Sequence, residues 1–169
     1  MALLLQDKVL VKEMKLRDQL IGRGFGELKN QVLVLDLHEA LFLSAKDKLE
    51  IENESGKKAD AEELMKLGQK ADKKFYSNHI VFADLRERGF VVKTGLKFGF
   101  DFRVYPRGKK QGEAHTQWVV SVCTQEEKFS MPELSRMVRL AGNIKTELLQ
   151  AIVDSEDDIN YYRIERIVP

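Results

Sequence analysis

The sequence is poor in cysteine and has no long apolar run, and these absences limit the classes of protein to consider. A single cysteine, Cys123, stands among 169 residues. No disulfide can therefore form within the chain, and we expect a reducing, cytoplasmic setting. No apolar stretch approaches the roughly 20 residues that cross a bilayer. The apolar start, residues 1–5, is short and has no basic leader, so we expect no signal peptide.

The chain also lacks an excess of charge of either sign, with 28 basic and 27 acidic residues and a net charge of +1. The distribution of charge is more informative than its sum. Residues 86–110 contain eight basic side chains against two acidic ones, and four of the five residues 154–158 are acidic. The basic segment would bind a phosphate backbone, meet the acidic segment across a subunit interface, or form ordinary solvated loops.

The first part of the chain is predicted to fold as a small N-terminal α+β domain, residues 1–77. Short apolar runs separated by glycines in residues 7–35 indicate a small antiparallel sheet. Asp36 is placed to cap a helix that runs through Leu43, because its carboxylate can accept hydrogen bonds from the first helical turn. Residues 60–75 have apolar side chains at helical spacing and predict a second, amphipathic helix.

The remainder, residues 78–169, is predicted to be a C-terminal α/β domain with a central mixed sheet flanked by helices. The pattern indicates a helix that ends at Gly89 and a later helix that runs from Pro132 to about Ile152. Strands are expected at residues 90–92, 97–105, 115–122 and 159–168. The fold class is therefore α/β (α+β).

Tyr105 and His115 lie at the two ends of the loop between two of the predicted strands. If the strands pair in that register, the two residues face each other with Cβ atoms about 5 Å apart. A phenol and an imidazole beside Arg107 would form an acid/base pair next to a phosphate-binding loop. The alternative is an ordinary strand-end tyrosine and an exposed histidine.

Lys145 lies at the edge of the apolar face of the helix predicted from Pro132, about 100° from Ile144. A lysine in such a position either extends its ammonium group into water or directs it into a cleft, where it would supply positive charge.

Tyr105 and His115 belong to segments that resemble, in the same order, segments of the archaeal tRNA-splicing endonucleases (tRNA-intron lyases). The resemblance covers nearly the whole chain, and its combination of motifs is specific where each alone would be weak. The matching segments are residues 24–28 (GFGEL), 37–43 (LHEALFL), 93–105 (KTGLKFGFDFRVY), 112–115 (GEAH), 138–141 (VRLA), 151–154 (AIVD) and 161–162 (YY).

The resemblance implies an endonuclease that excises introns from precursor tRNA at bulge-helix-bulge sites, with no metal ion and no cofactor. A ribose 2′-hydroxyl would attack the adjacent phosphate and leave 2′,3′-cyclic phosphate and 5′-hydroxyl ends. The family's tyrosine falls on Tyr105, which would remove the 2′-hydroxyl proton, and its histidine falls on His115, which would protonate the departing 5′-oxygen. A lysine would stabilise the charge on the phosphorus.

The sequence departs from the family pattern at this lysine. The family's lysine lies seven residues after the arginine that matches Arg139, a position occupied here by Thr146. Lys145 is one residue early. Either Lys145 takes the lysine's role, or the chain is a non-catalytic structural subunit of a heteromeric splicing endonuclease.

The resemblance also implies RNA-binding residues and an assembly. Arg139 matches an arginine that grips a flipped-out base, with Arg163 or Arg166 as the second and Arg107 on the adjacent loop. A chain of this length would form a homotetramer, a dimer of dimers, paired through its last strand; the alternatives are separate dimers without a tetramer, or a heterotetramer with a different partner chain. An acidic loop would insert into a neighbouring subunit; its side chains are Asp154, Glu156, Asp157 and Asp158.

A metal-dependent nuclease is the competing enzymatic interpretation. Asp101 followed by Glu126 and Lys128 imitates the Asp…Glu-x-Lys arrangement in which carboxylates bind Mg²⁺. The pattern is short and easily met by chance.

Overall fold

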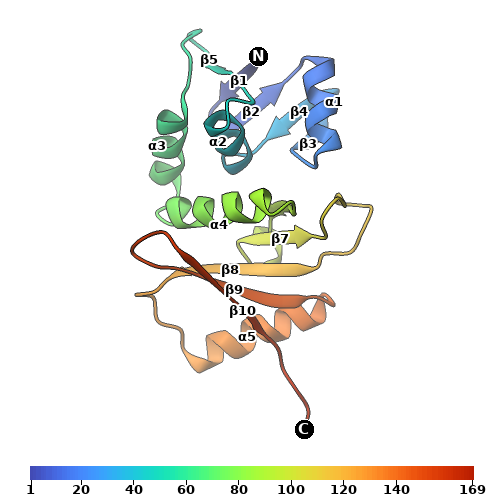
Figure 1. Cartoon of the computed structure of the whole chain (residues 1–169), viewed down its shortest axis with the longest axis vertical. Helices are drawn as coiled ribbons and strands as arrows, with labels where there is room; N and C mark the ends of the chain where they lie inside the picture. Colours follow the sequence, from blue (N-terminus) through green and yellow to red (C-terminus); the bar gives the residue numbers. More distant parts are fainter. The chain divides into compact units, whose positions relative to one another are not determined.

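The computed structural model describes residues 1–169, and the chain divides into two compact units, Met1–His79 and Ile80–Pro169 (Figure 1). The division falls inside one helix, α4. Each unit contains one five-stranded mixed sheet with helices, which confirms the predicted α+β class. None of the helices is both long and apolar enough to span a membrane.

Unit 1 is built on a sheet with the strand order β3-β4-β2-β1-β5, in which only β1 and β5 run parallel. The predicted helices at 36–43 and 60–75 are confirmed as α2 and α3. The elements of unit 1 are β1 (Ala2–Leu5), β2 (Lys8–Val11), α1 (Met14–Gly22), β3 (Glu27–Lys29), β4 (Val32–Leu35), α2 (Leu37–Ala45), β5 (Ile51–Asn53) and α3 (Ala61–Ala71).

Helix α1 is absent from the sequence-based prediction, which assigned residues 7–35 to strands alone. It is nine residues long, buries only Leu20, and its N-cap residue Glu13 makes no side-chain capping bond. The usual helix signals, a repeated apolar face and a capping side chain, are therefore weak in this segment.

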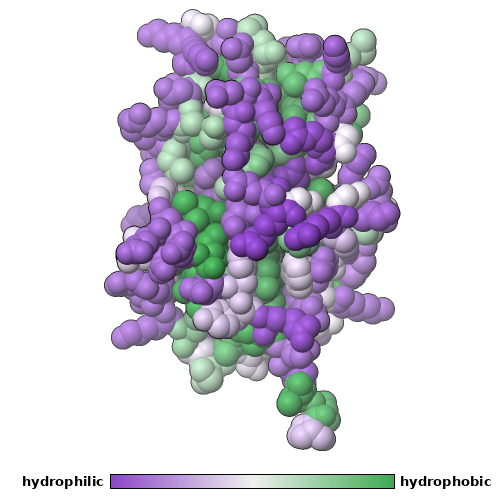
Figure 2. Space-filling view, in the orientation of Figure 1, coloured by the Kyte–Doolittle hydropathy of each residue, from purple (hydrophilic) through white to green (hydrophobic).

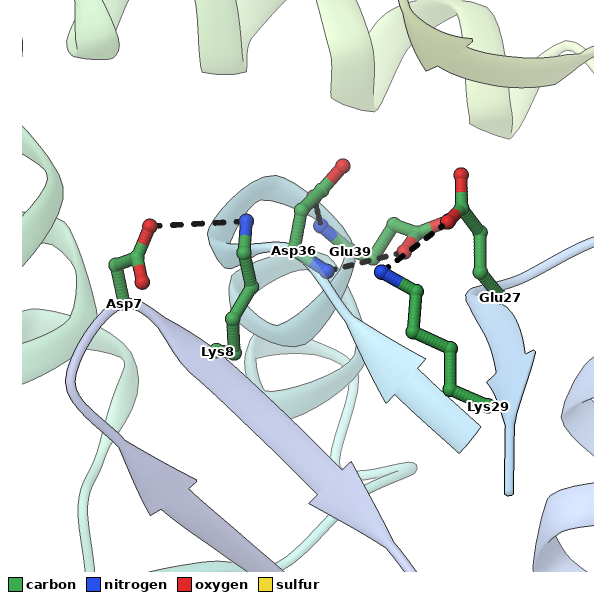
Figure 3. A network of polar contacts seen from close by, with 6 residues as sticks. All are labelled: Asp7, Lys8, Glu27, Lys29, Asp36 and Glu39. Carbon is green, nitrogen blue, oxygen red and sulfur yellow. Dashed lines mark hydrogen bonds and ion pairs between the residues drawn. The ribbon is translucent and has the colours of Figure 1, made fainter. Parts of the chain in front are cut away.

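Helix α2 starts with a reciprocal capping arrangement between Asp36 and Glu39 (Figure 3). Asp36 Oδ1 accepts a hydrogen bond from the Glu39 amide at 2.9 Å, and Glu39 Oε2 accepts from the Asp36 amide at 3.2 Å. The other oxygen of Glu39, Oε1, accepts from the Gly26 amide at 2.9 Å. Gly26 has a positive φ of +65°, and a Cβ there would lie 2.5 Å from the Leu33 side chain. The carboxylate of Glu39 is 2 % exposed and links two segments that are distant in sequence.

Two rings of histidine and one of phenylalanine stack within unit 1. His38 lies 4.2 Å from Phe75 and 5.7 Å from His79 between ring centroids, with planes within 9° of parallel. Burial lowers the pKa of His38 to about 4, opposed in part by Asp72 and assisted by Lys8. Burial, with a smaller contribution from His38, lowers the pKa of His79 to about 3. Both rings are therefore neutral in the folded protein near pH 7.

Unit 2 is built on a sheet with the order β10-β9-β8-β7-β6, in which β8 and β9 run parallel and the other neighbours antiparallel. Helix α5 makes the crossover between the two parallel strands. The elements of unit 2, with the helix that leads into it, are α4 (Phe75–Glu87), β6 (Val91–Thr94), a 3-10 turn (Leu96–Phe98), β7 (Phe102–Tyr105), β8 (Trp118–Thr124), α5 (Met131–Asn143), β9 (Glu147–Val153) and β10 (Ile159–Ile164).

Helix α5 and the C-terminal half of α4 contact opposite faces of this sheet. Phe82 of α4 lies 5.9 Å from Phe102 of β7 between ring centroids. Met137 and Ala141 of α5 form a core cluster with Val119 and Leu148. Phe102 pairs with Val120, the neighbour of Val119. Because adjacent strand residues point to opposite faces, the two helices cover different sides.

The predicted helix from Pro132 to Ile152 is wrong in its second half. Helix α5 ends at Asn143, and residues 147–153 form strand β9. This strand lies between β8 and β10 and is largely buried on both faces. A central strand of this kind has a continuous apolar run, which periodicity alone does not separate from a helix.

The strand predicted over residues 97–105 is shorter than expected. Its first part forms the 3-10 turn, so β7 contains only Phe102–Tyr105. The partner strand β8 begins at Trp118, not at His115. The last strand is confirmed but ends at Ile164, and the chain continues as a tail whose Ile167 and Val168 are exposed, seen as apolar atoms at the C-terminal end in Figure 2.

Replacing Glu39 with alanine is expected to destabilise unit 1 by about 2–4 kcal/mol, because two partly buried amide groups lose their acceptors. The measurement is urea denaturation followed by circular dichroism. Glu63→Ala is the matched control, since Glu63 occupies the same third position of α3 but is exposed. Its change should stay below about 1 kcal/mol. Equal losses in the two variants would contradict the linking role of Glu39.

The stacked histidines predict a loss of stability in acid. Their folded-state pKa values lie below the unfolded value of about 6.5, so the unfolded chain binds more protons as the pH falls. The contribution of the two neutral histidines to the free energy of unfolding should be at its full value above pH 6.5. It should then fall by up to about 1.4 kcal/mol per pH unit for each histidine between pH 6 and the folded pKa values. Urea midpoints at pH 7.5, 6 and 5 measure this slope.

Part of the pH dependence of the free energy of unfolding is due to the two histidines. The variant His38→Phe, which keeps a ring against Phe75, should remove about half of that part. The double variant His38→Phe/His79→Phe should remove that part. An unchanged slope in the double variant would show that other groups cause the acid sensitivity.

Candidate active site

The turn that leads into β7 depends on two glycines. A Cβ at Gly95 would lie 2.9 Å from the main-chain carbonyl of Phe102, which leaves no room for a side chain. Gly99, which ends the 3-10 turn, has φ +80°, a left-handed conformation that glycine adopts without strain. These two positions fold the segment so that β7 ends at Tyr105.

Asp101 fixes the start of β7 to β8. Its amide donates to the Val120 carbonyl at 2.9 Å, and its Oδ2 accepts from the Val122 amide at 2.8 Å. The carboxylate therefore serves main-chain pairing. No group of three or more His, Cys, Asp or Glu side chains is arranged to hold a metal ion.

The pairing register places Tyr105 and His115 differently from the sequence-based expectation. Val104 pairs with Trp118, and the Gln117 amide donates to the Val104 carbonyl at 2.8 Å. Tyr105 is therefore opposite Gln117 rather than His115, two residues out of the expected register. It is also buried, with 3 % of its surface exposed.

Tyr105 nevertheless lies on the same sheet face as α5. Arg103 pairs with Val119, whose side chain packs against Met137 and Ala141 of that helix. Because side chains alternate along a strand, Tyr105 shares this face with Val119 and Gln117.

The end of α5 is a left-handed turn at Lys145. The Lys145 amide donates to the Gly142 carbonyl and the Thr146 amide to the Ala141 carbonyl, both at 3.0 Å. Lys145 has φ +54°. These bonds form the Schellman arrangement, in which the left-handed residue is usually glycine. A lysine in this conformation costs roughly 1–2 kcal/mol, so the surrounding contacts must hold it there.

Thr146 supplies one of those contacts. Its Oγ1 lies 2.9 Å from the Gln117 carbonyl and 3.2 Å from the Thr116 carbonyl, to which it donates. The hydroxyl attaches the turn to the chain just before β8. Sequence reasoning did not anticipate Thr116, Gln117 or this use of Thr146, because the pattern assigned residue 146 to the middle of a helix.

His115 reaches the same turn. Its Nε2 lies 3.0 Å from the main-chain carbonyl oxygen of Lys145. A carbonyl only accepts hydrogen bonds, so Nε2 is the donor and carries a hydrogen. Both side chains are exposed to solvent. The structure thus brings His115 and Lys145 together through a backbone atom that the sequence pattern did not reveal.

Two of the predicted RNA-binding arginines already contact other side chains. The Arg107 guanidinium lies 4.9 Å above the Phe90 ring, and Arg163 pairs with Glu147 at 3.7 Å and Glu165 at 3.6 Å. Arg139 on α5 and Arg166 beyond β10 are exposed. All four guanidinium groups belong to unit 2.

The side chains of the basic segment, residues 86–110, differ in their exposure and in their contacts. Lys93 is buried, and Arg88 donates to Asp84 Oδ2 at 2.7 Å. The same carboxylate oxygen accepts from the Tyr161 hydroxyl at 2.7 Å, so burial and this bond raise the pKa of Tyr161. This contact joins α4 to β10 and explains why a tyrosine occupies position 161.

The acidic segment forms the tight turn between β9 and β10. Asp154 Oδ1 accepts from the amides of Glu156 and Asp158 at 2.8 and 3.0 Å. Asp157 has φ +65°, as expected where a hairpin turn ends in a left-handed residue. Asp154 therefore stabilises the turn, and the side chains of Glu156, Asp157 and Asp158 are exposed.

Comparison with known proteins matches both parts of the chain to domains of one family. Residues 75–161 match the family model described as tRNA intron endonuclease, catalytic C-terminal domain, and residues 1–65 match tRNA intron endonuclease, N-terminal domain. A relative from Thermococcus onnurineus, named tRNA-splicing endonuclease, is 38 % identical over 94 % of this chain and 91 % of its own length.

Two further relatives carry the same name. The protein of Thermococcus gammatolerans is 41 % identical over 85 % of this chain and 83 % of its own length. The protein of Methanothermobacter thermautotrophicus is 33 % identical over 95 % of this chain and 94 % of its own length. The chain therefore belongs to the tRNA intron endonuclease family, and it is an endonuclease with both the family's N-terminal domain and its catalytic C-terminal domain.

Proposed function

We propose that this endonuclease excises introns from precursor tRNA at bulge-helix-bulge sites, by attack of a ribose 2′-hydroxyl and without a metal ion. The family and the names of its relatives support tRNA splicing as the process. Recognition of unpaired bulges fits the general behaviour of RNA-binding proteins, which read duplex RNA by shape and grip extruded bases individually.

The proposed reaction assigns one step to each of three side chains. Tyr105 takes the proton from the 2′-hydroxyl as its oxygen forms a bond to phosphorus, and the bond from phosphorus to the 5′-oxygen breaks. His115 gives its proton to that 5′-oxygen, and the Lys145 ammonium stabilises the added negative charge on the phosphoryl oxygens. The products are a 2′,3′-cyclic phosphate and a 5′-hydroxyl.

The observation that supports this assignment is the hydrogen bond between His115 Nε2 and the Lys145 carbonyl. It brings the loop before β8 to the C-terminal turn of α5, and the register of β7 and β8 puts Tyr105 on that same sheet face. The three residues come from three separate segments, which is the usual construction of an active site.

The proposed RNA contacts use the arginines of unit 2. Arg139 is exposed on α5, four residues before the helix ends, and Arg107 is exposed on the loop that follows Tyr105. Planar guanidinium groups stack on extruded bases and pair with phosphates. Arg166 is a better second base-gripping candidate than Arg163, whose charge is shared with two glutamates.

Removing the phenol hydroxyl or the imidazole of the proposed acid/base pair should slow cleavage of an intron-containing precursor tRNA. Tyr105→Phe and His115→Ala are each expected to lower the single-turnover rate by about 10²- to 10⁴-fold. Tyr162→Phe is the matched control, because Tyr162 is 53 % exposed on β10, and it should keep the wild-type rate. The assay is run in EDTA with end-group analysis of both products. A requirement for Mg²⁺, or 5′-phosphate ends, would overturn the proposal.

One observation favours a second role, that of a structural subunit. The family's lysine position holds Thr146, whose hydroxyl is bonded to main-chain carbonyls and carries no charge. A chain that fails to cut precursor tRNA alone, but cuts it when a second subunit is added, would establish this role.

We further propose that the chain assembles as a homotetramer, a dimer of dimers, so that two active sites act on two bulges. Strand β10 lies at the sheet edge, and its free side is open to pairing with another chain. The acidic turn that precedes it presents Glu156, Asp157 and Asp158 to solvent, and such a turn would bind a basic surface on a neighbour.

Reversing two charges of this turn should weaken the assembly. The variant Glu156→Lys/Asp158→Lys keeps the amides that bond to Asp154, so the turn should persist while its charge is lost. We expect the tetramer dissociation constant to rise at least 10-fold in sedimentation equilibrium at about 0.15 M salt. At this concentration, salt screens partly buried charge pairs only weakly. Glu54→Lys/Glu126→Lys is the control with the same change of charge. Equal effects of both variants would contradict a specific contact.

A further inference from the structure

The residue that ends α5 contributes a backbone atom as well as a side chain. Lys145 adopts the left-handed conformation, although glycine and asparagine, which favour it, occupy positions 142 and 143 just upstream. The amide bonds of Lys145 and Thr146 to the helix, together with the Thr146 hydroxyl, hold this conformation. The result is a carbonyl at residue 145 that lies outside the helical hydrogen-bond pattern.

That carbonyl accepts from His115 Nε2 at 3.0 Å, and it determines which ring nitrogen can exchange protons. A carbonyl oxygen requires a donor, so Nε2 keeps its hydrogen in both charge states of the ring. Nδ1 is then the ring nitrogen that gains and loses a proton. The orientation of a catalytic imidazole is generally set by the bond made by its other nitrogen.

We propose that Lys145 is a positioning residue through its main-chain carbonyl, which orients His115 and makes Nδ1 the atom that protonates the leaving 5′-oxygen. This role of Nδ1 in cleavage rests on the proposed function, whereas the position of the ring does not. In the step itself, the Nδ1–H bond breaks, the proton goes to the 5′-oxygen as its bond to phosphorus breaks, and the ring becomes neutral. The hydrogen bond from Nε2 to the Lys145 carbonyl is the same before and after proton transfer, so the imidazole ring need not rotate.

The side chain and the carbonyl of Lys145 can be separated by substitution. Lys145→Gly removes the ammonium but favours the left-handed turn, so the carbonyl should stay in place. Lys145→Val also removes the ammonium, and its β-branched side chain disfavours this conformation, so the carbonyl should move. The two variants differ in the proposed positioning role and share the loss of charge.

The test is nuclear magnetic resonance of ¹⁵N-labelled protein without RNA. The chain has three histidines, and His115→Gln identifies the signals of His115. Wild type and Lys145→Gly should show His115 with its hydrogen on Nε2 and an observable, slowly exchanging Nε2 proton at low temperature. Lys145→Val should lose that proton signal. Hydrogen on Nδ1 in the wild type, or the same spectrum in all three proteins, would overturn the inference.

If Lys145→Val fails to fold, Thr146→Val replaces it, because it removes the hydroxyl that anchors the turn. Thr146→Ser keeps the hydroxyl and should restore the Nε2 proton signal. Failure of the serine variant to restore a signal lost in Thr146→Val would also count against the inference.

Single-turnover cleavage separates this inference from the proposed function. Lys145→Gly and Lys145→Val should both be slower than wild type, and the valine variant should be slower again by at least 10-fold. Equal rates with the expected spectra would leave the ring positioned as described but deny that its position matters for cleavage. A wild-type protein that has the expected spectrum but does not cut precursor tRNA would refute the proposed function alone.

Discussion

The candidate site depends on one backbone constraint, the left-handed turn at Lys145. This turn ends α5 after Asn143 and allows β9 to begin four residues later, parallel to β8. Through the Thr146 hydroxyl it is attached to the carbonyl of Gln117, the residue opposite Tyr105. Its own carbonyl accepts from His115. The sheet, the helix and the loop before β8 therefore meet at one point because the helix ends there.

Several residues that make the family resemblance recognisable act on main-chain geometry rather than on chemistry. Gly26 and Glu39 lie in separate N-terminal motifs and are joined by a hydrogen bond. Gly95 has no room for a Cβ, and Asp101 bonds to the Val122 amide. These contacts need a particular residue at a particular place. A motif can thus be specific to a family while most of its letters describe how the chain turns.

The parts of the fold with local signals could be predicted from the sequence, and the parts set by pairing could not. Asp36 and Gly89 mark helix ends through their own side chain or conformation, and both were found where expected. The end of α5 has no such mark, because its left-handed residue is a lysine. The register of β7 against β8 depends on tertiary contacts, so Tyr105 and His115 could be named as candidate site residues while their geometric relation could not be derived.

The displaced lysine has a different meaning once the turn is known. On a continuous helix, one residue would rotate a side chain by about 100°, and Lys145 would point away from the family's position. Here residues 145 and 146 lie after the helix, where that rotation does not apply. Thr146 uses its hydroxyl to hold the turn, a role that a lysine side chain could not fill with the same short bond. Position 146 thus supplies the anchor, and position 145 supplies both the exposed ammonium and the carbonyl beside His115. The chain can therefore lack the expected lysine at position 146 and still present positive charge at the proposed site.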